Sequence, residues 1–364
     1  KIGQEIQLSL ESGESFNVLI KQNSSSSSNK VWYSSNEEVA TVDNNGKVKG
    51  VGLGHATISV RDTNLGVVGK VIVNVYRDVT GAITVPMVTV DDYTTVILKE
   101  DGTVWTSGQN DKGQLGNGLT STSNIPVQVM KKDGDDITEL TNIKKIAVGR
   151  TFVMALSVDG KVYAWGRNEY GQLAQGLAAG TADQKYAVEM KVTDDQNISN
   201  AIDIAAGAHH SVVLTADGKV YVAGYNYWYQ NLTTGREDKV YYLKDTGVQN
   251  GIRATAGFSN VAVMQSNSDV LAWGENARGE IETNSNPGLL YKLTSEADWV
   301  EFSYYNSYVI KEDGSLWASG ANGSGNLVIE NDTSDKTALT RSTLPLDENG
   351  NEIKVKDISA HSTV

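Results

Sequence analysis

The sequence predicts an all-β protein in which a small N-terminal sandwich precedes a β-propeller. A unit of roughly 50 residues recurs along most of the chain, which is typical of repeat architectures. Short alternating runs rich in Val, Tyr, Trp and Ile are separated by turns, as in strands of a β protein. Glycine is abundant, at 36 of 364 residues, whereas proline is scarce, at 4, so the chain is turn-rich without being a disordered low-complexity sequence.

The clearest copy of the unit runs from Ile143 to Gly176. Two strand-like runs, Phe152–Leu156 and Val162–Trp165, flank the turn Val158-Asp159-Gly160-Lys161. Asp-Gly between two apolar runs is a strong hairpin signal, because the turn needs residues that accept positive φ. Each unit is therefore a hairpin with one or two flanking strands.

Five copies of this hairpin can be aligned. The strand after each turn ends in a glycine: Gly108, Gly166, Gly224, Gly274 and Gly320. An asparagine follows two residues later: Asn110, Asn168, Asn226, Asn276 and Asn322. The fourth copy lacks the turn glycine and reads Asn267-Ser268-Asp269. One such unit cannot bury its own faces, whereas units stacked around an axis bury each other, which predicts a propeller.

Two segments carry a family resemblance. Residues 204–214, IAAGAHHSVVL, resemble the signature segment of the regulator of chromosome condensation repeat, and residues 108–116, GQNDKGQLG, resemble its second recurring segment. The resemblance covers about residues 83–364 and implies a propeller domain over 80–364. The signature histidine is His210, and other copies place different residues there: Thr94, Phe152, Asn260 and Asn306.

The end of the chain predicts a further unit. Residues 354–361, KVKDISAH, read as the first strand of a sixth repeat, after which the sequence stops at Val364. An open arc of five units would leave strand edges unpaired. We therefore expect the propeller to be partial, with the natural polypeptide continuing beyond this point.

Residues 1–79 form a separate unit. Period-two segments are expected as strands: Ile6–Leu10, Phe16–Ile20, Val31–Tyr33, Val39–Val42, Ala56–Val60 and Val67–Tyr76. Turns are expected at 44–46 and 50–54, a loop at the serine run 24–28 and a short linker at 77–82. This spacing predicts a small antiparallel sandwich.

The segment from Val31 to Val60 closely resembles the group 2 bacterial immunoglobulin-like domain. The resemblance implies a bacterial cell-surface or secreted protein, in which this domain acts as a spacer or an adhesive module. The linker at 77–82 has little slack, so we expect the two domains to be positioned relative to each other.

Composition excludes several functions. The chain has no cysteine, which excludes disulfides, thiol catalysis and cysteine metal sites. Its net charge of −13, from 31 basic and 44 acidic side chains, does not provide the basic surface of a nucleic-acid binder. No apolar run approaches about 18 residues, so no membrane insertion is predicted for this chain.

No catalytic constellation is visible either. The four histidines lack the spacing of zinc ligands, and no phosphate-binding glycine loop or nucleophile elbow is present. His209 and His210 are expected to be structural, as part of the strand signature. The sequence predicts no enzyme, no catalytic or metal-binding residue and no cofactor.

Aromatic residues gather where the third copy departs from the repeat. Gly113, Gly171, Gly279 and Gly325 in other copies correspond to a tyrosine-rich stretch in the third. The candidate binding residues are Tyr225, Tyr227, Trp228, Tyr229, Tyr241, Tyr242, Tyr304 and Tyr305. Aromatic rings on loops supply contact area for protein partners and for stacking sugars. The alternative is that they fill the space left by the missing glycines and pack between blades.

Three function classes remain open. The first is a non-catalytic extracellular binding or adhesion module that presents propeller loops to a protein or glycan. The second is a secreted inhibitor that binds a partner enzyme through the propeller face. The third, nucleotide exchange, is implied by the founding member of the repeat family, but the acidic charge and the bacterial immunoglobulin-like neighbour argue against it.

Overall fold

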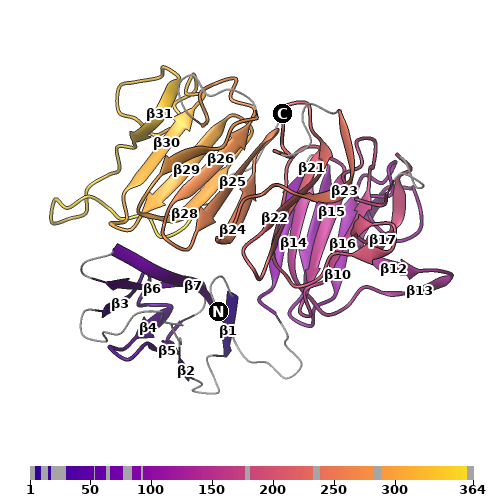
Figure 1. Ribbon diagram of the computed structural model, residues 1–364, viewed down its shortest axis with the longest axis horizontal. Coiled ribbons are helices and arrows are strands. Elements are labelled where there is room, and N and C mark those ends of the chain that lie inside the picture. The colour runs from indigo at the N-terminus through magenta and orange to yellow at the C-terminus, as the bar shows by residue number, and fades with distance from the viewer. Residues whose placement is uncertain are drawn as a thin grey trace.

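The structure is a computed structural model, drawn in Figure 1. It describes residues 5–9, 15–17, 30–52, 54–62, 66–76, 84–91, 93–176, 181–232, 238–281 and 288–358. Within these ranges the secondary structure consists of strands, turns and loops, with no helix, so the predicted all-β class is confirmed. The serine run 24–28, the linker 77–82 and His361 lie outside the described residues.

Residues 84–341 contain five successive four-stranded antiparallel blades, each built from consecutive strands. The first two blades are β8 (Met87–Asp91), β9 (Thr94–Leu98), β10 (Val104–Gly108) and β11 (Ser123–Gln128), then β14 (Ile143–Gly149), β15 (Phe152–Ser157), β16 (Val162–Gly166) and β17 (Gln184–Glu189). The third is β20 (Ala201–Ala206), β21 (His210–Thr215), β22 (Val220–Tyr225) and β23 (Lys239–Asp245). The last two are β24 (Gly251–Ala256), β25 (Asn260–Gln265), β26 (Val270–Gly274) and β27 (Tyr291–Thr294), then β28 (Ala297–Phe302), β29 (Asn306–Lys311), β30 (Leu316–Gly320) and β31 (Lys336–Arg341).

Two hairpins that the repeat pattern does not predict decorate the blades. The hairpin β12 (Met130–Asp133) and β13 (Asp136–Glu139) joins the outer edge of β17, and β18 (Lys191–Thr193) pairs with β19 (Gln196–Asn197). Both lie on connections between blades. The first strands of consecutive blades contact each other in the order β8, β14, β20, β24 and β28, so these strands surround a common axis.

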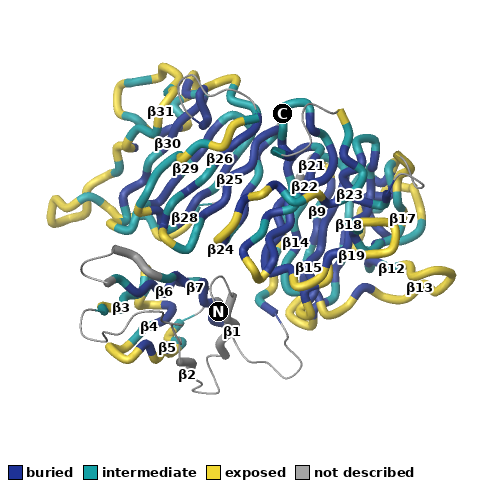
Figure 2. The backbone as a smooth tube through the Cα atoms, in the orientation of Figure 1, coloured by how far each residue is buried: buried dark blue, intermediate teal, exposed yellow. Residues whose placement is uncertain are grey.

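The middle strands of the second, third and fourth blades are largely buried on both faces. Every residue of β15 and β16 is buried, and Figure 2 shows β15, β21 and β25 in dark blue. Alternate residues of β15 enter different cores: Val153 packs with the first blade, whereas Met154 packs with the third. These strands are therefore almost continuously apolar, because a blade is covered by a neighbour on each side.

The recurring asparagine closes the loop that follows each blade's third strand. Its Oδ1 accepts a hydrogen bond from the backbone N–H five residues later, in all five copies: Asn110–Leu115 2.9 Å, Asn168–Leu173 2.9 Å, Asn226–Asn231 2.6 Å, Asn276–Ile281 2.8 Å and Asn322–Leu327 3.0 Å. A buried backbone donor left unpaired is costly, so the asparagine stabilises the loop conformation.

A glycine at the end of the first strand in the second, third and fourth blades (Gly149, Gly207 and Gly257) allows neighbouring backbones to approach at the axis. A Cβ added at Gly207 would lie 2.6 Å from the carbonyl oxygen of Gly257 in the next blade. Real Cβ atoms do not come this close to a carbonyl oxygen, so alanine would force the two strands apart.

The start of a sixth unit is present. In each blade junction, the first strand of the next blade donates a backbone N–H to the turn of the preceding hairpin: Ile143–Gly102 3.1 Å, Ala201–Gly160 3.0 Å, Gly251–Gly218 3.0 Å and Ala297–Ser268 3.0 Å. Val355 makes the same bond to Gly314 at 2.9 Å. Residues 354–358 thus occupy the place of a sixth first strand, although they are not hydrogen-bonded as a strand.

The N-terminal domain is a two-sheet sandwich. One sheet holds β1 (Glu5–Ser9), β7 (Gly66–Tyr76), β6 (Gly54–Asp62) and β3 (Lys30–Ser34), and the other holds β2 (Ser15–Asn17), β5 (Lys47–Gly50) and β4 (Ala40–Val42). Two expectations are corrected. β1 pairs parallel to β7, so the sandwich is not purely antiparallel, and the short strand β5 lies between the two predicted turns.

Candidate binding face

The propeller has two distinct ends. At the turn end lie the hairpin turns, such as residues 158–161, that join the second and third strands of each blade. At the opposite end, the loop end, the first strand turns into the second and the third strand leaves the blade. Side chains from two loops per blade therefore meet at the loop end.

Eight rings from four blades are in contact at the loop end, and we call them the aromatic belt: Tyr170, His209, Tyr225, Tyr227, Trp228, Phe258, Tyr304 and Tyr305. All eight are half-buried, so each ring keeps part of its surface exposed. Five of them belong to the predicted set, whereas Tyr170, His209 and Phe258 do not.

The belt consists of two runs that meet at His209. In the first run, Tyr170 lies 5.0 Å from His209 and 5.1 Å from Tyr225 by ring centroids. Tyr227 continues it, stacked at 6.2 Å on Tyr225 and edge-on at 5.1 Å to Trp228.

The second run crosses to the fourth and fifth blades. His209 lies 6.1 Å from Phe258, which stacks on Tyr304 at 4.0 Å. Tyr304 then meets Tyr305 at 4.1 Å in an edge-on contact. Edge-on and offset contacts are the arrangements that aromatic rings prefer, so the belt is a packed and ordered surface.

The repeat explains how these rings come together. Phe258 and Tyr304 occupy the same position of successive units, two residues after the last residue of the first strand. Tyr170 and Trp228 likewise share a position, four residues after Gly166 and Gly224. A search for aromatics at equivalent positions of the two loops would have found the three missed residues.

The other three predicted residues pack against loops of the protein itself. Tyr229 has φ 61° in the position where four copies have glycine, and its ring lies beside Gly288. On β23, Cδ1 of Tyr241 lies 3.1 Å from a Cβ built on Gly171, and Oη of Tyr242 lies 2.8 Å from one on Gly176. The alternative, packing between blades, therefore describes Tyr229, Tyr241 and Tyr242. The other five predicted residues belong to the belt.

Cations flank the belt. Lys239 lies 5.8 Å from the ring centroid of Tyr170, and Arg278 lies 5.9 Å from that of Tyr305. Burial, reinforced by Tyr305, raises the pKa of the Tyr304 hydroxyl to about 12, so this phenol is neutral at physiological pH. The belt thus combines neutral rings with positive charge at its rim.

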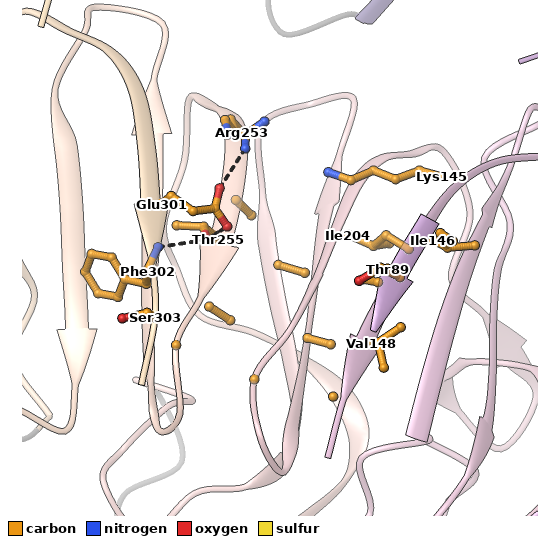
Figure 3. Close-up of a pocket in the computed structure, with 18 of the residues that line it drawn as sticks. Thr89, Lys145, Ile146, Val148, Ile204, Arg253, Thr255, Glu301, Phe302 and Ser303 are labelled. Atoms are coloured by element: carbon orange, nitrogen blue, oxygen red, sulfur yellow. Dashed lines mark hydrogen bonds and ion pairs between the residues drawn. The ribbon is translucent and has the colours of Figure 1, made fainter. Parts of the chain in front are cut away.

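A cavity of about 270 Å³ runs along the axis between the first strands (Figure 3). Its middle is lined by small residues such as Ala147 and Ala256, and its turn end by charged ones. Arg253 bonds Glu301 at 3.0 Å, and Lys145 forms an ion pair with Asp203. Because these charges are paired within the wall, the cavity is less suited to a ligand than the belt is.

The histidine of the repeat signature lies inside the propeller. His210 is fully buried against Gly207, and burial lowers its pKa to about 3, so the imidazole stays neutral. His209, by contrast, is half-buried in the belt. Among the described residues, no group of three or more His, Asp or Glu side chains could hold a metal ion, and none of them forms an apolar helix long enough to cross a membrane.

The N-terminal domain lies at the turn end of the fourth and fifth blades, below β24–β30 in Figure 1. Lys70, whose side chain is fully buried, donates to the carbonyl of Ala297 at 2.6 Å and lies 3.4 Å from Glu312. His55 stacks on Trp299, with ring centroids 4.4 Å apart. The domain therefore occupies the turn end and leaves the belt on the opposite end.

Comparison with known families agrees with this architecture. Residues 101–156 and 159–214 match the regulator of chromosome condensation (RCC1) repeat, and a second model of that repeat matches 143–172 and 201–230. Residues 7–73 match the bacterial Ig-like domain (group 2). Both predicted resemblances are confirmed.

Curated relatives match parts of the chain. The RCC2 homolog of Danio rerio is 33% identical over 129 residues, which is 35% of this chain and 24% of that protein. The ultraviolet-B receptor UVR8 of Arabidopsis thaliana is 26% identical over 249 residues, 66% of this chain and 54% of the receptor. The chain thus spans only about a quarter and about half of these two relatives.

Solved propellers share the fold. Human WBSCR16 superposes with a TM-score of 0.61 at 15% identity, covering 85% of this chain and 82% of that one. Yeast RCC1 (Prp20), solved bound to Kap60, gives 0.55 at 18% identity, covering 76% and 65%. These likenesses establish the β-propeller fold.

Proposed function

We propose that this chain, in which RCC1 repeats follow a group 2 bacterial Ig-like domain, is a non-catalytic binding module that holds a protein partner on the aromatic belt. The single observation that carries the proposal is the contact of eight half-buried rings drawn from four blades at one end of the propeller. Tyr, Trp and Arg dominate the energetic centres of protein interfaces, because they bury large areas at low conformational cost.

A protein partner is favoured over a glycan by two considerations. Most belt rings pack against one another, which leaves mixed edges and faces suited to side chains, with Arg278 and Lys239 at the rim. The yeast relative was solved bound to another protein, and its binding to Gsp1p and histones is described. Sugar stacking on exposed ring faces is the competing mode.

We further propose that the protein acts at the bacterial surface or after secretion, as an adhesion module. The group 2 bacterial Ig-like domain supports this location. Fractionation of the source cells tests it: recovery of the chain only in the cytosol would contradict the surface role and favour an intracellular regulator. Inhibition of a captured partner enzyme would instead support the inhibitor class.

The belt is tested by a double substitution, Tyr227→Ala with Trp228→Ala. We expect the affinity for a partner captured from host extracts to fall by about tenfold or more, since a central aromatic anchor contributes about 2 kcal/mol. The measurement is a titration of the purified full chain by surface plasmon resonance, run beside a glycan array.

The matched control is Trp105→Ala, a half-buried tryptophan at the turn end of the first blade whose Nε1 donates to Thr103. It should bind as the unmodified chain does. Unchanged binding by a folded belt variant would contradict the proposal, and binding to glycans alone would replace the protein partner with a sugar.

A further inference from the structure

In the first four blades, the loop after the third strand contains a buried side chain at one repeat position, six residues after the glycine, whereas Asn326 of the fifth blade is exposed there. The first three blades have an amide there: Gln114, Gln172 and Gln230. In each case Oε1 accepts the backbone N–H two residues earlier, from Lys112 at 2.8 Å, Tyr170 at 3.0 Å and Trp228 at 3.2 Å. The position therefore supports the loops from which Tyr170 and Trp228 enter the belt.

The fourth blade has a carboxyl group in this position. Glu280 is 1% exposed, and its Oε2 accepts the backbone N–H of Arg278 at 2.9 Å, as the glutamines do. The difference lies at its other oxygen. Gln230 donates Nε2 to the carbonyl of Ser259 in the next blade at 3.0 Å, whereas Oε1 of Glu280, like Nε2 of Gln172, is buried with no hydrogen-bond partner among the described residues.

The bond made by Gln230 in the third blade indicates what Oε1 would face. Ser259 directly precedes Asn260, and the equivalent residue of the fifth blade is Tyr305, directly before Asn306. A carboxylate has no proton to donate to a carbonyl, but a neutral carboxylic acid does. The protonated acid is therefore the form that mimics the glutamine.

The charge of Arg278 and the backbone hydrogen bonds to the Glu280 carboxyl lower its pKa, but they do not offset its burial. Glu275 of the same loop opposes its ionisation, and the guanidinium of Arg278 is turned toward Asp335, 3.5 Å away, and the ring of Tyr305. From the fifth blade, Ser319 donates only to the backbone carbonyl of Glu280, at 3.1 Å. Burial, as the largest cause, raises the pKa of Glu280 to about 7.

We propose that Glu280 is a proton-dependent positioning residue of the aromatic belt. As the neutral acid it fixes loop 275–281 in the conformation that the glutamines give the other blades, and so holds Arg278 beside Tyr305. Ionisation places an unpaired charge in the loop and loosens this end of the belt. The consequence for binding rests on the proposed function, whereas the loosening of the loop does not.

The direction with pH follows from the pKa values. The pKa of about 7 in the folded protein lies above the ordinary glutamate value of 4.5, so the loop is most stable when Glu280 is protonated. The stability of the loop falls as the pH rises from 4.5 to about 7, and above about 7 it stays constant. Between pH 6 and pH 8, the ratio of closed to open loop should fall about tenfold, which is the free-energy equivalent of about one pKa unit.

The test is hydrogen–deuterium exchange of the full chain at pH 6 and pH 8, with intrinsic rates corrected for pH. In the unmodified protein, protection of residues 275–281 should fall about tenfold from the lower to the higher pH. Glu280→Gln should abolish this dependence and gain protection at pH 8. Residues 225–231, which contain Gln230, are the internal control and should not respond.

Gln230→Glu is the matched converse, because it moves the carboxyl to the third blade. It should transfer the pH dependence to residues 225–231. The inference is overturned if Glu280→Gln leaves the exchange of 275–281 at both pH values as in the unmodified chain, or if that loop does not respond to pH. If the loop responds to pH but the belt variants bind as the unmodified chain does, the proposed function is contradicted and the role of Glu280 in the loop is not.

Discussion

At the scale of single residues, Asp203 joins three blades at the axis. Its Oδ1 accepts the ammonium of Lys145 from the second blade, and its Oδ2 accepts the backbone N–H of Ala254 in the fourth at 2.9 Å. The carboxylate is 7% exposed, so these partners replace its hydration. It acts as a bridge between strands that share no sheet.

Asp203→Asn tests this bridge. An amide supplies one acceptor instead of two and removes the charge that pairs with Lys145. We expect the free energy of unfolding to fall by about 1–3 kcal/mol, measured by urea denaturation. The control is Asp195→Asn in an exposed turn, which should change little. Equal effects of the two substitutions would show that the bridge is energetically unimportant.

The sequence predicts some of the belt residues but not all of them. Tyr225, Tyr227 and Trp228 stand out because they interrupt a glycine pattern within one loop. His209 and Phe258 do not, because each is an isolated ring on a different blade, and only the arrangement around the axis brings them within 6.1 Å. Neighbouring residues in the chain therefore do not reveal contacts between blades, and only a comparison of equivalent repeat positions points to these rings.

At the scale of elements, the loops after the third strands need a left-handed residue. Gly171 has φ 87°, and a Cβ there would lie 2.7 Å from the carbonyl oxygen of Val240. Tyr229 adopts φ 61° at the same repeat position in the third blade. A non-glycine residue in this region carries a conformational cost, which here accompanies the tyrosine-rich stretch of the belt.

Two substitutions at Tyr229 separate the backbone cost from the loss of the ring. Tyr229→Gly and Tyr229→Ala both delete the side chain that packs on Gly288, but only glycine relieves the left-handed conformation. We expect the free energy of unfolding of Tyr229→Gly to exceed that of Tyr229→Ala by about 1 kcal/mol, measured by thermal denaturation. If alanine is as stable as glycine, the position is not strained.

The sequence predicts the hairpins of the blades better than their outer strands. Each hairpin has local turn chemistry, whereas the outer strand β17 follows a long connection and pairs with β16 through a bulge. β12 and β13 carry mostly exposed residues and lack apolar alternation. These elements are held by pairing to a blade that already exists, so their own residues are weakly patterned.

At the scale of the whole molecule, the N-terminal domain is docked and not merely tethered. Trp299 of the fifth blade contacts two groups that cannot share one face of its ring: His55 of the N-terminal domain, at 4.4 Å, and Arg253 of the fourth blade, at 3.3 Å. The indole therefore lies between the domain and the propeller. This agrees with the short linker and places the belt at a fixed distance from the N-terminal domain.

Lys70 is the centre of this docking, and its loss is the last prediction. Lys70→Met keeps the apolar stem but leaves the carbonyl of Ala297 without its donor and the carboxylates of Asp298 and Glu312 without the shared ammonium. Because removing one partner of a buried ionic cluster costs about 3–5 kcal/mol, we expect the two domains to uncouple. Calorimetry should then resolve two unfolding transitions where the unmodified chain shows one. Lys356→Ala, which removes an exposed ion pair with Glu38, is the control and should preserve a single transition. If Lys70→Met also unfolds in one unshifted step, the domain is a spacer as its family resemblance implies, and the orientation of the belt is set by the propeller alone.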